Sequence, residues 1–240
     1  MSVFKPTQWA VSYLAALLAA LLCPGSASAQ INVAVVPVQD AGNAPDGNGR
    51  GAVSYSYGIG KFDVTAGQYA AFLNAVATGQ DVYHLYDSGM APGNYAACGI
   101  TQSVVANGFA YSVSEQSQNL PVNGISWGAA ARFCNWLSNG QPTGTEGPGT
   151  TETGSYTLSG ISGGGAVRNS GAKYALPTAN EWYKAAYHDP SIQSYYLYPT
   201  RSNAFPNNVL SATRSTTPTT QSTGRQQRRS QQRAFANRHQ

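Results

Sequence analysis

The chain has 240 residues, and only 10% of them are charged, against about 25% in ordinary soluble proteins. Residues 31–210 carry seven basic and ten acidic side chains, whereas residues 211–240 carry six arginines and no acidic residue. The net charge of +4 therefore comes from the C-terminal segment, and this distribution argues against a nucleic-acid-binding face on the rest of the chain.

Residues 1–29 have the pattern of a secretory signal peptide. Lys5 provides a positive charge, residues 9–22 form an apolar run, and Ala27 and Ala29 provide small side chains around a cleavage site. The apolar run is shorter than the roughly 20 residues that a membrane span needs. We expect cleavage near Ala29 and an exported protein, periplasmic or extracellular, without a membrane span.

The first part of the mature chain predicts two strands and a loop. Residues 31–38 and 53–64 are rich in Val, Ile, Tyr and Phe, as strands are, and residues 40–51 contain the Gly, Asn, Asp and Pro of a loop.

A first helix is predicted directly after Thr65. Gln68 lies three residues after Thr65, which is the spacing of a capping box. We expect the helix to end near Thr78–Gly79. Its apolar face consists of Tyr69, Phe72, Leu73 and Val76.

A second helix is predicted after Ser126, which is placed to cap it, and Asn139–Gly140 should end it. Gly124–Gly128 also fits the G-x-S-x-G pattern of hydrolases, but residues 160–164 fit it too, so the role of helix cap is preferred for Ser126. The expected buried stripe of this helix is Trp127, Ala130, Ala131, Cys134 and Leu137.

A third helix is predicted after Thr178, with Glu181 completing a second capping box. Trp182, Ala185 and Ala186 are expected to face inward, and Asp189–Pro190 should end the helix. Between the second and third helices, Ser155–Leu158 is a short strand candidate in a Gly-, Ser- and Thr-rich stretch.

Short strands, short helices and long loops together predict an α+β domain with little regular secondary structure, over residues 30–210. Residues 211–240 are rich in Ser, Thr, Gln and Arg and hold almost no apolar side chain. Such a composition predicts a disordered basic tail.

Cys98 and Cys134 are the two cysteines that remain after signal cleavage. An oxidising compartment permits a disulfide between them, which a chain-entropy estimate values at roughly 3–4 kcal/mol. The alternative is two separate buried thiols that behave as small apolar groups. The sequence leaves both readings open.

Three blocks in this order resemble the formylglycine-generating enzyme family, also called sulfatase-modifying factors. The first block runs over residues 57–73, the second over residues 121–137 and the third over residues 176–186. A Tyr-Pro-Thr-Arg-Ser-Asn stretch at Tyr198–Asn203 is similar to the exported bacterial branch. The likeness extends over residues 31–210.

The resemblance implies an irregular α+β fold related to C-type lectin-like domains. Enzymes of the family use oxygen and a copper ion, held by two cysteine thiolates, to convert a cysteine of a sulfatase into formylglycine. They also carry calcium. Relatives on the same fold include other oxygen-dependent enzymes and binding proteins.

The family's two thiolates follow the third block, and no cysteine follows Cys134 in this chain. We therefore carry over no catalytic residue and expect no copper site. Asn207 and Asn208 are the nearest candidates for the calcium ligands that the resemblance implies. A genuine short variant and a reading-frame shift near residue 211 would both explain the missing end.

The sequence thus predicts a sulfatase-modifying-factor-like protein that is catalytically incomplete as written. We expect a binding or structural module whose partner is an exported protein, a peptide or a glycan. The alternative is an oxygen-dependent formylglycine-generating enzyme whose true C-terminus is missing from this chain.

Overall fold

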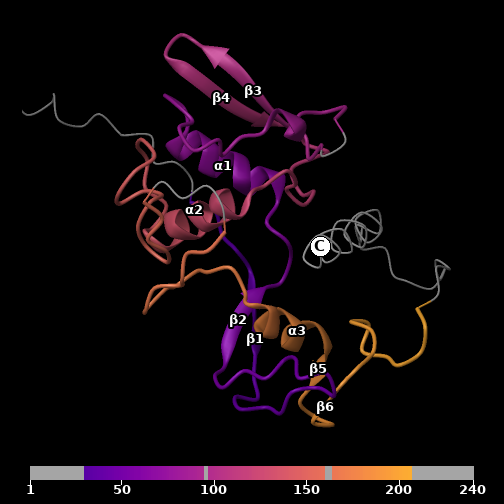
Figure 1. Ribbon diagram of the computed structural model, residues 1–240. Coiled ribbons are helices and arrows are strands. Elements are labelled where there is room, and N and C mark those ends of the chain that lie inside the picture. Colours follow the sequence, from indigo (N-terminus) through magenta and orange to yellow (C-terminus); the bar gives the residue numbers. More distant parts are fainter. Residues whose placement is uncertain (1–29, 95–96, 160–163, 207–240) are drawn as a thin grey trace, which may run out of the picture. The chain divides into compact units, whose positions relative to one another are not determined.

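A computed structural model describes residues 30–94, 97–159 and 164–206 (Figure 1). The predicted signal peptide and basic tail lie outside these ranges. The chain in these ranges is a mixture of short helices and short strands joined by long loops, as an α+β class requires. The elements are β1 Val35–Val38, β2 Tyr57–Gly60, α1 Ala66–Val76, η1 Ser88–Met90, β3 Ile100–Val105, β4 Gly108–Val113, α2 Trp127–Ser138, α3 Ala179–Tyr187, β5 His188–Asp189 and β6 Ser194–Tyr195.

Three antiparallel pairs of strands make up the sheet structure of the described residues: β1 with β2, β3 with β4, and β5 with β6. β1 begins at Val35 and not at Ile31 as predicted, because the backbone N–H and C=O of Ile31 bond to the side chain of Gln141 instead. The candidate strand at 155–158 is reduced to one bridge between Tyr156 and Arg168.

The hairpin of β3 and β4 was not predicted, although Asn107–Gly108 at its turn is a hairpin signal. Gly108 has a φ of +133°, and a Cβ on it would lie 2.0 Å from the carbonyl oxygen of Thr78. The adjacent Phe109 N–H donates to that same oxygen at 2.6 Å. Glycine is therefore required where the hairpin meets the end of α1.

All three helix starts agree with the sequence. Complete capping boxes are formed by Thr65 with Gln68 and by Thr178 with Glu181, and the Ser126 hydroxyl accepts from the Ala129 N–H at 3.1 Å. The helix ends lie one to three residues before the predicted stops, at Val76, Ser138 and Tyr187.

α1, α2 and the β3–β4 hairpin enclose the larger hydrophobic cluster. The predicted face of α1 is fully buried, which confirms the periodicity argument. The ring of Phe72 lies 5.4 Å from that of Phe133 and 5.2 Å from that of Trp136. These aromatic contacts between α1 and α2 form the centre of the cluster.

α2 also contributes to a second cluster, made of Ala131, Cys134, Tyr156 and Leu158. Ala131, Cys134 and Leu137 of the predicted stripe are buried, whereas Trp127 and Ala130 are half-buried. A single stripe was too narrow a prediction, because the helix packs against apolar groups on two sides. The buried positions that it missed include Arg132, Phe133, Asn135 and Trp136.

The prediction that Trp182 faces inward from α3 is wrong. Trp182 is 37% exposed, and Ala185 and Ala186 are half-buried. The buried side chains are Glu181 and Lys184, at 3% and 1% exposure. A polar pair can occupy this face because each side chain has a hydrogen-bond partner from a distant segment.

Candidate functional site

A groove of about 710 Å³ lies beside β1 and β2 in the described residues. It is bordered by β1, β2, α2, the segment 172–177 and the start of α3. Its lining is mainly apolar and includes Val35, Ile59, Phe62, Ala130, Phe133 and Leu137. Phe62 is 69% exposed and Val35 57%, so apolar surface is open to solvent at the strand side of this groove.

One part of the groove wall is polar. Arg168 binds both carboxylate oxygens of Glu181, with Nη1–Oε1 at 2.9 Å and Nη2–Oε2 at 2.8 Å. The hydroxyl of Tyr55 donates to Glu181 Oε1 at 2.7 Å, and the hydroxyl of Tyr57 donates to the Glu181 backbone carbonyl. β2, the segment before it, the 168 loop and α3 thus meet at one residue, Glu181.

Glu181 remains ionised in this setting. Burial raises the pKa of its carboxyl, but hydrogen bonds from Arg168, Tyr55 and the Thr178 N–H outweigh burial and lower it to about 2. The hydrogen bonds to Glu181 in turn raise the pKa of the Arg168 guanidinium. Burial also raises the pKa of Tyr57 to about 12. These groups are therefore a satisfied ionic cluster, and none of them is a proton donor or acceptor near neutral pH.

Cys134 also lines the groove. Burial raises the pKa of its thiol to about 12, and the nearby Arg168 reduces this effect only in part. The thiol is therefore protonated and unreactive at neutral pH.

Cys98 lies in the other cluster, where its sulfur is 3.9 Å from the Met90 carbonyl oxygen. Both cysteines are free and buried. The structure thus has the separate thiols of the second reading and no Cys98–Cys134 disulfide. Two buried thiols in different clusters do not fit a copper(I) ion, which needs two thiolates at a fixed separation.

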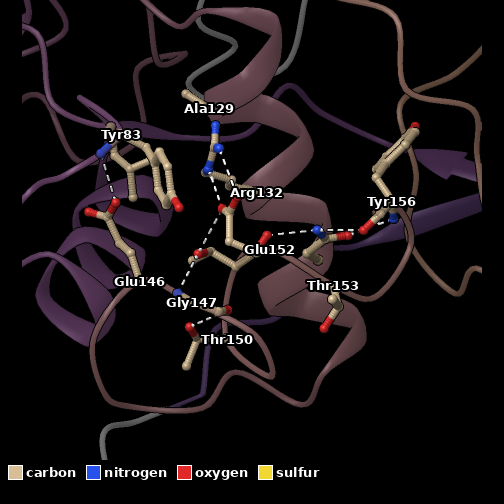
Figure 2. A network of polar contacts seen from close by, with 12 residues as sticks. Tyr83, Ala129, Arg132, Glu146, Gly147, Thr150, Glu152, Thr153 and Tyr156 are labelled. Carbon is tan, nitrogen blue, oxygen red and sulfur yellow. Dashed lines mark hydrogen bonds and ion pairs between the residues drawn. The ribbon is translucent and has the colours of Figure 1, made fainter. Parts of the chain in front are cut away.

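A buried ion pair connects α2 to the loop that precedes Tyr156 (Figure 2). Arg132 of α2 donates to Glu152 through Nε at 2.6 Å and Nη2 at 3.0 Å, and the two residues are 1% and 5% exposed. The guanidinium lies 3.9 Å from the centre of the Tyr83 ring. This bidentate geometry holds the loop before Tyr156 against α2.

Asn135 adds three further bonds to the same loop. Its Nδ2 donates to the carbonyls of Thr151 and Tyr156 at 2.7 and 3.0 Å, and its Oδ1 accepts from the Tyr156 N–H at 2.8 Å. Neither Arg132 nor Asn135 was predicted from the sequence to be buried. Their position among apolar residues of a buried helix is the signal that could have revealed them, because buried polar groups need partners.

Neither of the calcium candidates, Asn207 and Asn208, falls within the described residues. Across residues 30–94, 97–159 and 164–206, no three His, Cys, Asp or Glu side chains come together as a metal-binding group. No helix in the same ranges is both long and apolar enough to cross a membrane.

Comparison with known proteins gives one match. The sequence model of a family described as the sulfatase-modifying factor enzyme 1-like domain matches residues 39–235. No curated protein and no solved structure matches significantly.

Proposed function

The chain belongs to the sulfatase-modifying factor enzyme 1-like family, and on this premise we propose that it is an exported binding module that holds an extended segment of another exported protein without oxidising it. The observation that carries the proposal is the groove at β1 and β2, which combines open apolar surface with a satisfied ionic boundary and a protonated thiol. Such a surface favours binding over redox chemistry.

The strands beside the groove support an extended peptide as the partner. In the described part of the chain, β1 and β2 pair only with each other, so each has an outer edge of backbone groups. A peptide added to such an edge gains main-chain hydrogen bonds, and alternate side chains fill the apolar lining. Val35, at 57% exposure on β1, would contact such a peptide directly.

The ionic cluster limits which peptides fit. Arg168 and Glu181 satisfy each other, so an additional charge would have no partner there and would be desolvated at a cost. The exposed part of Tyr55 can still contact a polar group. We therefore expect a partner segment that is apolar at alternate positions and uncharged beside Arg168.

Binding can be measured with a fluorescent peptide of alternating valine and threonine and the mature chain. Replacement of Val35 by Lys should weaken binding at least about tenfold, because it places a charge on the apolar wall. Val104→Lys is the matched control, since Val104 is 84% exposed on β3 and does not line the groove. Equal affinity of the two variants, or no binding by the unmodified chain, would refute the proposal.

The family match itself favours one alternative, an oxygen-dependent formylglycine-generating enzyme. The protein assay combines the mature chain, copper(I) and a sulfatase-type cysteine peptide, and mass spectrometry then follows the mass loss of thiol-to-aldehyde conversion. We expect no conversion, and an aldehyde product would replace the binding proposal with the enzyme.

A further inference from the structure

A second cavity, of about 460 Å³, lies between the loop 44–48, α3 and the β5–β6 hairpin. Its volume is within the roughly 300–1,000 Å³ of small-molecule sites. No residue lines both this cavity and the apolar groove. α3 contributes Glu181 to the groove and Tyr183 and Tyr187 to the second cavity, so the two sites use different faces of one helix.

Tyrosine rings form the wall of this cavity, which we call the tyrosine cleft. The ring of Tyr183 lies 4.7 Å from that of Tyr187 and 5.6 Å from that of Tyr195, with tilts of 37° and 38° between the ring planes. All three side chains are half-buried. The rings therefore present part of their surface to the cleft and do not stack flat upon one another.

The position of Tyr195 is set by three other residues. Asn43 donates to its hydroxyl at 2.5 Å, and the hydroxyl donates to the Ala44 carbonyl at 2.9 Å. Gly51 has a φ of +85°, and a Cβ there would come within 2.6 Å of the tyrosine ring. An aromatic wall that is held in this way loses little conformational entropy when a ligand binds.

Polar groups lie at the rim of the tyrosine cleft. Asp46 accepts from the Tyr183 hydroxyl at 2.7 Å and from the backbone N–H groups of Asn48 and Arg50 at 2.9 Å. Hydrogen bonds from Arg50 and Tyr183 lower the pKa of Asp46 to about 2, so it is a carboxylate at neutral pH. The exposed amides of Asn48 and Gln193 complete this rim.

This combination differs from the apolar groove in its chemistry. Few aliphatic side chains line the cleft, and ring faces alternate with acceptor and amide groups. Pyranose sugars have the same alternation, with C–H faces that pack on aromatic rings and hydroxyls that bond to carboxylates and amides. Among the described residues that line the cleft, Asp46 alone is charged, and its negative charge disfavours sugars that carry carboxylates or phosphates.

We propose that the tyrosine cleft is a binding site for a neutral pyranose glycan. The site is separate from the peptide groove, and it does not depend on the function proposed for that groove. Tyr183, Tyr187 and Tyr195 contact the C–H faces of the sugar, and Asp46 and Asn48 bond to its hydroxyls.

The test uses the mature chain and three neutral trisaccharides (cellotriose, maltotriose and fully N-acetylated chitotriose), with trigalacturonate as an acidic comparator. Saturation-transfer NMR and calorimetry should detect at least one of the neutral sugars and not the acidic one. If no neutral sugar binds, the proposal is overturned. It is also overturned if the acidic sugar binds as strongly as the best neutral one.

Substitutions locate the sugar. Tyr187→Ala should weaken binding at least about tenfold, and Asn48→Ala about fivefold through loss of one hydrogen bond. Asn48 is exposed on a loop, so its substitution decides the question if the tyrosine variant fails to fold. Val35→Lys, in the other groove, should leave sugar affinity unchanged. A loss confined to Val35→Lys would place the sugar in the peptide groove and overturn the assignment.

Discussion

Glu146 is a half-buried carboxyl in an unusual setting. Its Oε2 accepts from the Tyr83 N–H at 2.9 Å, whereas no donor in the described ranges reaches its buried Oε1. Burial raises its pKa to about 8, with a further contribution from Asp81 and an opposing one from the Tyr83 N–H and Arg132. A protonated Glu146 can donate to the Asp81 carboxylate, so the neutral acid is the form that fits this position.

Stability should therefore decrease as pH rises past the carboxyl's ordinary pKa. Between 4.5 and about 8, the folded state keeps a proton on Glu146 that the unfolded state has lost, and this difference favours unfolding more at each higher pH. Glu146→Gln imitates the neutral acid. We expect the free energy of unfolding in urea to fall less between pH 5 and pH 8 in this variant, by the order of 1 kcal/mol after solvent screening. An identical pH profile in the two proteins would mean that Glu146 ionises normally.

At the scale of elements, α3 shows how a polar face can be the buried one. Glu181 closes the capping box and holds Arg168, and the Lys184 ammonium donates to the Asp40 carbonyl at 2.6 Å. α2 presents the opposite case, because aromatic and aliphatic side chains surround most of it. The two helices should therefore respond differently when their tryptophans are removed.

Trp136→Ala on α2 should cost about 3–5 kcal/mol of unfolding free energy, as for a large buried side chain. Trp136 is 2% exposed, packs against Phe72 and Phe133, and donates from Nε1 to the Pro142 carbonyl at 2.9 Å. Trp182→Ala on α3 should cost less than about 1 kcal/mol, because that ring is partly exposed. Denaturant unfolding of both variants is the measurement. Comparable losses would show that α3 buries the face predicted from its sequence.

At the scale of the whole molecule, α2 joins the two hydrophobic clusters. Phe133 and Trp136 belong to the first, and Ala131 and Cys134 to the second. The buried Arg132–Glu152 pair lies on the same helix. Removal of one partner of such a pair generally lowers the free energy of unfolding by about 3–5 kcal/mol. Because one helix holds this pair and contributes to both clusters, we expect the two clusters to unfold together.

The free cysteines can test this cooperativity, because Cys98 reports on the first cluster and Cys134 on the second. We expect a thiol reagent to label both with the same dependence on denaturant, as for one two-state transition. Peptide mapping by mass spectrometry distinguishes the two sites. If one cysteine is labelled at a much lower denaturant concentration than the other, the two clusters open separately. If neither cysteine is labelled in the unfolded chain, the two form a disulfide.

Much of the local structure could be predicted because it depends on neighbouring residues. A capping residue and its partner are three positions apart, so Thr65, Ser126 and Thr178 could be assigned from the sequence. The buried face of α1 could be predicted because Tyr69, Phe72, Leu73 and Val76 recur at helical spacing. The β3–β4 hairpin could also have been predicted from Asn107–Gly108.

The candidate sites could be predicted only in part. Cys134 was expected to be buried and is, but its place in the apolar groove could not be foreseen. The role of Tyr195 could not be predicted either, because its partners Asn43 and Gly51 come from the other end of the domain. Sequence spacing carries no information on such long-range contacts.

The sequence by itself determined the family blocks, the helix starts and the low charge of residues 31–210, because these depend on residue identity and short-range spacing. Only the tertiary structure decided that Glu181 and Lys184 are buried while Trp182 is partly exposed. The reason is the distance along the chain at which the partners lie: Asp40 is 144 residues before Lys184. A polar side chain can be buried only where the fold brings such a partner to it.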